Sequence, residues 1–327
     1  MICVLSGVVF IVVFALALMV GKYKISFNCF FQAISGKPGF EIEKSIIVNL
    51  RLPRTIVAAL TGIALSLSGL LYQETFQNKL VSPDLLGVSS GSGVGAAIAI
   101  VAGLPAFAVS ALSFVFGIGT VLMTLTVSKL FRNNSSLMLV LSGIIVGGLA
   151  GAVLSFIKYL ADAETTLASI TFWLMGSFEH CKISDVFILA PIVGVCVFII
   201  VSISWRINVV ALGREEAQTK GINYRAYRFL IIAVATLLTA SSVSFAGTIG
   251  WIGLVVPHIA RICVGRNTVR TIPLCIAFGS TFIILTDVIS RTFTAAEIPI
   301  SAITGLFGTI VFIIILFVRR KTINEND

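Results

Sequence analysis

The chain of 327 residues has little charge: only 11% of its residues are Asp, Glu, Lys or Arg, whereas 57% are hydrophobic. A soluble domain of this length needs far more charge on its surface. The mean hydropathy is +1.08. Apolar runs of about 20 residues recur along the sequence, and each is long enough to cross a bilayer as a helix. The sequence therefore predicts an all-α polytopic membrane protein with one transmembrane domain, residues 1–327.

The sequence also lacks the patterns of a nucleotide, metal or catalytic site. Ser90–Gly95 (SGSGVG) is rich in glycine, but no strand precedes it and no Gly-Lys-Ser/Thr follows, so it is not a phosphate-binding loop. The six cysteines are scattered without metal-ligand spacing, and we interpret them as small hydrophobic residues. We expect a chain that is not an enzyme and holds no cofactor. If ATP drives transport, ATP and Mg bind to a separate ATPase.

About ten membrane spans are expected from hydrophobic length. An even number places both termini on one side, and the basic tail of Arg319, Arg320 and Lys321 indicates that this side is the cytoplasm. The first run begins at Met1 without a basic region or cleavage site, which favours a retained span, with a secretory signal as the alternative. The expected spans are residues 3–20, 55–74, 86–104, 107–128, 137–157, 186–204, 229–246, 249–264, 272–290 and 299–318.

The net charge of the chain is +9. In a membrane protein such an excess of Lys and Arg is expected in the loops that stay inside. The loop from Gly21 to Pro53 is the exception, since this topology places its basic residues outside. A basic outer surface could serve a function: Arg51 and Arg54 are either interfacial anchors or docking points for an acidic partner. The inside loops hold Lys129, Arg132, Arg266 and Arg270, and the exceptional loop holds Lys22, Lys24, Lys37, Lys44 and Arg51.

A charged segment from Arg206 to Arg228 separates two apolar runs. Within it, Gly213–Lys220 is expected to form a short helix. Glu215 and Glu216 lie in its first turn and a lysine in its last, an arrangement that suits the helix dipole. Gly221 follows where a left-handed C-cap residue is needed. The segment is either a solvated connector or a docking site for a soluble partner on the cytoplasmic side.

Small residues recur at helical spacing in several expected spans. Such ridges let helix backbones approach closely in lipid, where no hydrophobic force drives helices together. Most are expected to pack helices within one subunit, and some are candidates for a dimer interface or a gate. The ridges are Gly87, Gly91 and Gly95; Gly143, Gly147 and Gly151; and one that starts at Gly62 and Ser66. The candidate gate or packing residues are Gly87, Gly91, Gly95, Gly250, Gly253 and Pro257.

Ionisable groups within spans are costly and therefore candidates for function. Asp287 and Arg291 lie four residues apart near the outer end of a span. They form either a local ion pair or part of a transport route, and we expect Arg291 to face water. Glu74 is expected to be solvated at the inner side, and Glu297 begins a broken stretch. His258 is expected to be a hydrogen-bonded structural residue rather than a metal ligand.

Six motifs follow one another along the chain: RLPRT at Arg51–Thr55; SLSGLLYQ at Ser66–Gln73 continuing to LLGVSSGSG at Leu85–Gly93; ALGREEAQTKG at Ala211–Gly221; FAGTIGWIGLVVPHIARICVG at Phe245–Gly265; Asp287 with Arg291; and EIPISAITGLFG at Glu297–Gly308. With these motifs the chain resembles the FecCD-type permease subunit of ABC importers for iron–siderophore complexes, haem and cobalamin. The resemblance extends from about Arg51 to Arg320. One departure is that the family usually has Asn-Pro-Leu-Ala where this chain has Asn78–Val81, NKLV.

The resemblance implies a type II ABC importer permease with ten helices in two inverted halves. It implies a complex of two permease subunits, identical or related, with two cytoplasmic ABC ATPases and one external substrate-binding protein, in the bacterial cytoplasmic membrane. Arg51, Arg54 and Arg291 would meet acidic residues of the binding protein. The residues expected to couple the chain to the ATPase are Ala211, Leu212, Gly213, Arg214, Glu215, Glu216, Ala217, Gln218, Lys220 and Gly221.

The function expected from this resemblance is import of ferric siderophores by alternating access. A cobalamin or haem importer of the same family is the alternative. A secondary transporter is a different class, but it needs buried carboxylates along a mid-membrane path, and only Asp287 comes near this. A structural or receptor-type membrane protein without transport is the third class.

Overall fold

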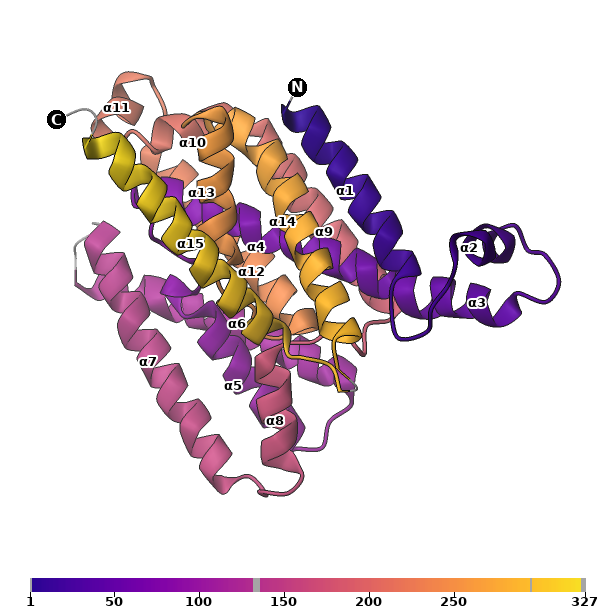
Figure 1. Ribbon diagram of the computed structural model, residues 1–327. Helices are drawn as coiled ribbons and strands as arrows, with labels where there is room; N and C mark the ends of the chain where they lie inside the picture. Colours follow the sequence, from indigo (N-terminus) through magenta and orange to yellow (C-terminus); the bar gives the residue numbers. More distant parts are fainter. Residues whose placement is uncertain (1, 132–135, 295, 325–327) are drawn as a thin grey trace.

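Helix α4 (Leu52–Thr75) runs through the middle of a helix bundle in the computed structural model of the chain (Figure 1). Nearly all of its side chains are buried. Much of this burial depends on small residues, because they let neighbouring backbones come close. The helices packed against α4 are α9 (Ile183–Ser202), α12 (Tyr224–Ala246), α13 (Ile252–Val264) and α14 (Thr268–Thr292).

Two polar contacts fix α4 against α12. The hydroxyl groups of Ser68 and Thr239 lie 2.7 Å apart, and those of Tyr72 and Thr236 lie 2.9 Å apart. All four side chains are buried. Within a membrane, such hydrogen bonds between helices hold the register of one helix against the next.

The remaining long helices pack around this centre. α1 (Ile2–Met19) lies against α14; α5 (Val88–Val101), α6 (Ala106–Leu130) and α7 (Ser136–Leu160) pack on one another; and α15 (Ile300–Asn324) contacts α13 and α14. Each of the ten predicted spans coincides with one helix, so the all-helical prediction is confirmed. Within the part of the chain that the structure describes, seven helices are long and apolar enough to cross a membrane, whereas α5, α13 and the apolar part of α15 are shorter.

Helix α8 (Thr166–Met175) was not predicted, because it is a short apolar helix. It ends at Gly176, whose φ of +75° suits a glycine. At this point the backbone forms hydrogen bonds with the ends of two other helices. The backbone of Ser177 donates to the carbonyl of Ala246, the last residue of α12, at 3.1 Å, and the backbone of Ile300, the first residue of α15, donates to the carbonyl of Gly176 at 3.1 Å. The C-terminal ends of α8 and α12 and the N-terminal end of α15 are thus joined by backbone hydrogen bonds.

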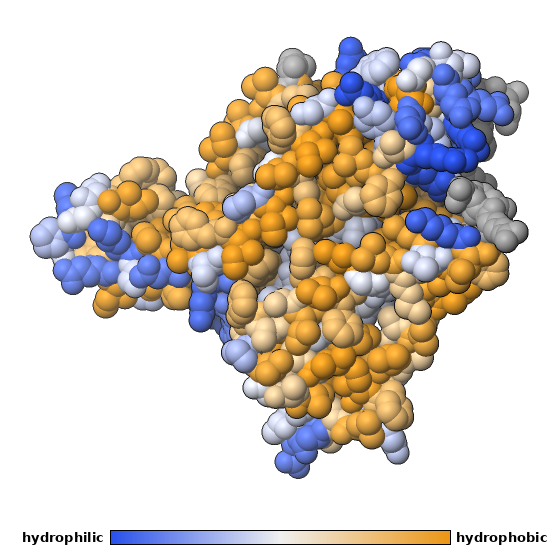
Figure 2. Space-filling model, turned by 180° about the vertical axis from the view of Figure 1, so that it is seen from behind, coloured by the Kyte–Doolittle hydropathy of each residue, from blue (hydrophilic) through white to orange (hydrophobic). Residues whose placement is uncertain are grey.

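Two ends of the bundle differ in what they present. One carries the short helices α10 (Ser204–Val210) and α11 (Arg214–Thr219), and we name it the α11 end. At the opposite end, α2 (Phe27–Ile34), α3 (Glu41–Ser45) and the π-helix η1 (Ile46–Arg51) project sideways from the start of α4. Figure 2 shows hydrophobic surface over the helices, with hydrophilic side chains gathered at the α11 end and on the projection.

The structure describes residues 2–131, 136–294 and 296–324, without the side chains of residues 316 and 318–324. Arg132 and the side chains of Arg319, Arg320 and Lys321 fall outside this description. The topology inferred from these basic residues therefore stays a prediction. Among the described cysteines, Cys196 and Cys275 are buried, as expected of small hydrophobic residues, while Cys3 and Cys263 are exposed.

Candidate functional site

Helix α11 is the short charged helix predicted at Gly213–Lys220, and it begins at Arg214. Glycines bound it on both sides: Gly213 has a φ of +113° and Gly221 a φ of +71°. Both angles lie where L side chains are strained, which is why glycine is required at these positions. Gly221 therefore takes the left-handed conformation predicted for it.

One residue, Ala217, attaches α11 to the rest of the chain. Its side chain is fully buried in a small cluster with Val209 of α10, Ile222, Tyr224 and Tyr227. The backbone of Ile222 donates to the carbonyl of Ala217 at 2.9 Å, which closes the turn after the helix. The other α11 side chains (Arg214, Glu215, Glu216, Gln218 and Thr219) are exposed. α11 is thus a charged surface fixed at one point.

The α11 segment also touches the end of central helix α4. The amide of Gln77 donates to the carbonyl of Ala211 at 3.2 Å. A side chain at Gly213 would lie 3.0 Å from the same amide nitrogen. Next to it, the guanidinium of Arg228 lies 6.0 Å from the ring centre of Phe76. The segment that leads into α11 is therefore connected to the residues that directly follow α4.

The motifs SLSGLLYQ and FAGTIGWIGLVVPHIARICVG meet at a buried polar cluster formed by Gln73, Glu74 and Arg261. Gln73 donates to the carbonyl of Gly253 at 3.0 Å and accepts a hydrogen bond from Arg261. Arg261 also pairs with Glu74 at 3.4 Å. The expectation that Glu74 is solvated is wrong, because its side chain is only 16% exposed and faces a cation. A polar Gln at the end of an apolar span was the sequence signal for this cluster.

The departure from the family pattern at Asn78–Val81 lies in the turn after α4. Gln77 has a φ of +53°. The side chain of Asn78 accepts from the backbone of Leu80 at 2.9 Å, and the backbone of Val81 donates to the carbonyl of Asn78 at 3.3 Å. The side chain of Asn78, a residue that the family pattern shares, therefore closes this turn, and Lys79 takes the position of the usual proline.

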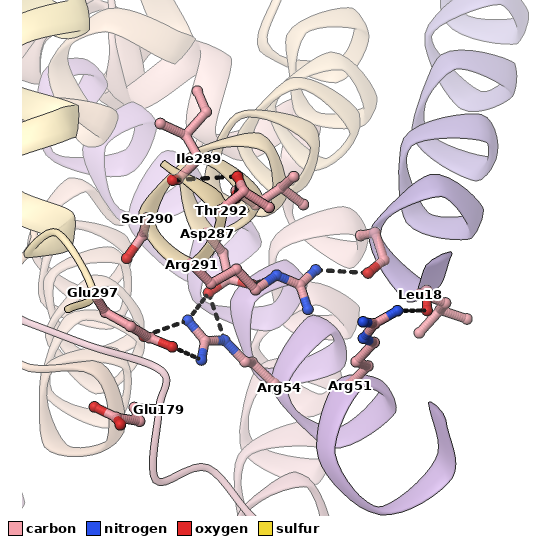
Figure 3. Close-up of polar contacts among 12 residues, drawn as sticks. Leu18, Arg51, Arg54, Glu179, Asp287, Ile289, Ser290, Arg291, Thr292 and Glu297 are labelled. Atoms are coloured by element: carbon pink, nitrogen blue, oxygen red, sulfur yellow. Dashed lines mark hydrogen bonds and ion pairs between the residues drawn. The ribbon is translucent and has the colours of Figure 1, made fainter. Parts of the chain in front are cut away.

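At the opposite end, Arg54 forms the centre of a buried ionic cluster (Figure 3). Its Nε donates to Asp287 at 2.7 Å, and its two terminal nitrogens donate to the two oxygens of Glu297 at 2.8 Å each. Arg291 adds a second cation, with its Nε 3.5 Å from Asp287. The local ion pair considered for Asp287 and Arg291 is present, but Arg54 makes the closer contact.

Two arginines of this end hold the last turn of α1 (Figure 3). Arg51 donates to the carbonyls of Leu18 at 3.0 Å and Met19 at 2.7 Å, and Arg291 donates to that of Ala17 at 2.6 Å. The final carbonyls of a helix have no partner within it, and a cation is favourable there. The expectation that Arg291 faces water is wrong, since only 5% of it is exposed.

Arg51, Arg54 and Arg291 are all buried in the chain alone. The sequence predicts that these three arginines lie at the same end of the bundle, and the structure shows them there (Figure 3). Each also has partners within the chain, which local sequence patterns do not show. Their role as docking points for a binding protein stays a prediction.

The candidate gate residues fall into two groups. Gly91 and Gly95 face α6, since a side chain there would overlap Phe116 or Leu112, and Gly87 starts α5 with a φ of +82°. This ridge packs two helices within one chain, as expected for most ridges. Gly253 lies against Pro83, whereas Gly250 has open space around it. Pro257 lies inside α13. A gating role for these residues stays a prediction.

Two aromatic contacts join α13 to α15. Trp251 has a φ of +73°, a strained angle for a residue with a side chain, and packs on Gly308 and Phe312. The buried His258 ring lies 6.1 Å from the ring of Phe312. His258 thus takes part in the contact between α13 and α15. Sequence patterns did not single out Trp251, because only the backbone conformation marks it.

A membrane bundle of helices with an exposed charged helix between two of its spans is the arrangement expected of an ABC importer permease. The chain belongs to the FecCD transport family, whose model matches residues 9–318.

Three comparisons support this assignment. The chain is 36% identical to the molybdate import system permease protein of Haemophilus influenzae, over 95% of this chain and 94% of that protein. It is 35% identical to a Helicobacter pylori protein named "Probable iron chelatin transport system permease protein", over 84% of this chain and 83% of that protein. A solved inward-facing structure described as that of "a putative metal-chelate type ABC transporter" is 34% identical and covers 97% of this chain and 98% of that chain, with a TM-score of 0.88.

Proposed function

We propose that this permease carries ferric siderophore complexes into the cell. Membership of the FecCD family makes it a membrane subunit that works with another permease subunit and an ATPase. The proposal concerns the cargo. It is supported by the similarity to the iron chelatin permease and to the structure of a metal-chelate type transporter.

A second candidate cargo is molybdate. The observation that favours it is the similarity to the Haemophilus influenzae permease, which covers nearly the whole of both chains. Molybdate and a ferric siderophore differ greatly in size, so the two candidates predict different uptake assays. Cobalamin and haem, the alternatives from the sequence, belong in the same comparison.

We further propose that the α11 end faces the cytoplasm and meets the ATPase. The observation that carries this is the exposed charged helix α11, which buries Ala217 against the rest of the chain. The segment that leads into α11 is also held near the end of α4, because Gln77 donates to the carbonyl of Ala211. Closure of the ATPase dimer on ATP would push α11, and α4 would carry that motion into the bundle. Two such subunits switching together would open the path between them to alternate sides.

The opposite end is then the outer face, where a substrate-binding protein docks. We retain the proposal that it docks over Arg51, Arg54 and Arg291. The three arginines are buried. Arg51 and Arg291 bond to the last carbonyls of α1, so they also hold a helix end that the binding protein would meet.

The cargo is tested by uptake in cells that lack the chain, with and without the wild-type chain restored. Labelled iron on several siderophores, molybdate, cobalamin and haem would be offered separately under iron limitation. Loss of uptake of one ferric siderophore, restored by the chain, supports the proposal. Loss confined to molybdate overturns it in favour of the second candidate. A chain with Ala217→Pro provides a coupling-deficient control at equal expression.

A further inference from the structure

Residues 20–51 form a folded projection at the start of α4, which we name the arm (Figure 1). Apart from Arg51 at its end, the functions proposed above do not use it. Its small core contains Ile25, Ala33 and Ile47, with Phe30 and Phe40 packed against them. The arm is therefore an ordered element with its own packing.

Two polar contacts stabilise the arm further. Ser26 caps α2 by accepting from the backbone of Cys29 at 3.3 Å. The hydroxyl of Tyr23 donates to Glu43 at 3.0 Å and ties the loop to α3. Because Ala33 and Phe30 of α2 pack into the arm core, the opposite face of α2 points outward.

That outward face is apolar. Phe27, Phe31 and Ile34 are spaced at i, i+4 and i+7, which places them on one side of α2. They are exposed by 67%, 53% and 53%. The rings of Phe27 and Phe31 contact each other, with centres 4.7 Å apart. The polar residue Asn28 lies on a different side of the same helix, so α2 has distinct apolar and polar faces.

The position of the arm relative to the spans indicates what covers this face. Arg51, at the end of the arm, donates to the last carbonyls of α1 and to the carbonyl of Tyr23 at 2.5 Å. The arm thus leaves the bundle at the level where α1 ends and α4 begins. In a membrane protein this level is the boundary between hydrocarbon and headgroups.

Other apolar side chains of α1 and of the arm are exposed as well. Most of the α1 apolar window is exposed, including Val4, Val8, Ile11 and Leu16. Ile42 and Leu50, on the α3 side of the arm, are exposed as well. Figure 2 shows this hydrophobic surface on the projection beside hydrophilic side chains.

We propose that the arm lies in the interfacial layer of the membrane, with Phe27, Phe31 and Ile34 of α2 inserted between lipids. Amphipathic helices with aromatic residues on one face and lysines nearby bind this layer. The exposed Lys22, Lys24, Lys37 and Lys44 outnumber Glu41 and Glu43, a balance that suits anionic headgroups. The inference holds for any cargo and does not depend on which side of the membrane the arm occupies.

The test places a tryptophan at Phe31 in the full chain, which tolerates this change because Trp prefers the interface. The purified protein is reconstituted in bilayers of zwitterionic and anionic lipid, with and without lipids brominated near the headgroup end of the acyl chain. The signal is the difference in emission between Phe31→Trp and the parent chain, which has three tryptophans. The matched control is Asn28→Trp, on the polar face of the same helix.

We expect the Phe31→Trp emission to be blue-shifted and to lose about half its intensity in brominated lipid, as a residue inserted at the interface should. The Asn28→Trp emission should be red-shifted and keep its intensity. A red-shifted, unquenched Phe31→Trp signal would show that the face meets water and would overturn the proposal. A blue-shifted but unquenched signal would show that the face packs against protein, such as a second copy of the chain, and would overturn it equally.

Discussion

The backbone of Gly69 in α4 lies directly against the backbone of Gly253 in α13, with no room for a side chain at Gly69. The same helices are joined by the hydrogen bond from Gln73 to the carbonyl of Gly253. Gly253 in turn packs on Pro83. This contact therefore sets the distance between α4 and α13, and both glycines belong to motifs of the family.

Gly69→Ala should destabilise the chain, because a methyl group at this position overlaps the Gly253 backbone and forces the helices apart. Overpacking of this kind costs about 1–3 kcal/mol. Thermal unfolding of the purified protein measures the effect. The control is Gly194→Ala in α9, where a methyl group meets no atom within 4 Å. Equal melting temperatures for the two variants would contradict the close contact.

Ala217→Arg should release the ATPase from the permease. A long charged side chain does not fit the fully buried site of Ala217, so α11 would leave its position at the end of the bundle. Co-purification of the ATPase and uptake of the cargo should both fall at least about tenfold, since burying an unpaired charge costs several kcal/mol.

Arg266→Ala is the control for Ala217→Arg, because Arg266 is exposed in the turn between α13 and α14. It should retain both activities. Full uptake by the Ala217→Arg chain would refute the assignment of α11 as the coupling element.

Much of this fold could be predicted from the sequence, because hydrophobic length depends on local composition. Every predicted span matches a helix, and the acids and glycines around Arg214 located α11. Helix α8 escaped prediction for the same reason. Its ten residues fall below the length needed to span a bilayer. The position of α8 in the bundle is fixed by the backbone hydrogen bonds that link Gly176 and Ser177 to the ends of α15 and α12.

The sequence indicated which charged residues mattered but not their surroundings. Arg54 and Asp287 are 233 positions apart, and no local pattern reveals that they touch. The same holds for Glu74 and Arg261. The position of Glu74 and Arg291 near span ends predicts that they face water. Both are instead paired inside the bundle, because an opposite charge lowers the cost of burying a charged side chain.

Arg54→Met should lower the stability of the permease even without a binding protein. Removing Arg54 leaves Asp287 and Glu297 without their main partner. Breaking a buried pair on one side costs about 3–5 kcal/mol. The measurement is thermal unfolding of the isolated permease, with Arg266→Met as an exposed control. Unchanged stability, combined with weaker docking of the binding protein, would assign Arg54 to docking alone.

Glu297 predicts a pH dependence of stability. Its partial burial by itself raises the pKa, but the hydrogen bonds and charge of Arg54 outweigh burial, so the pKa lies below its ordinary value of 4.5. A carboxyl group with a lowered folded-state pKa stabilises the fold fully above its unfolded pKa. This contribution is lost as the pH falls through the folded-state pKa. The wild-type melting temperature should therefore decline below about pH 5.

Glu297→Gln should lower the melting temperature at neutral pH and flatten the decline in acid, since Gln has no charge to lose. Glu215→Gln, on the surface of α11, should follow the wild-type curve because the side chain of Glu215 is exposed. The melting temperatures of the three chains would be measured between neutral and acidic pH. Parallel curves for Glu297→Gln and the wild type would show that the pair with Arg54 does not contribute to stability.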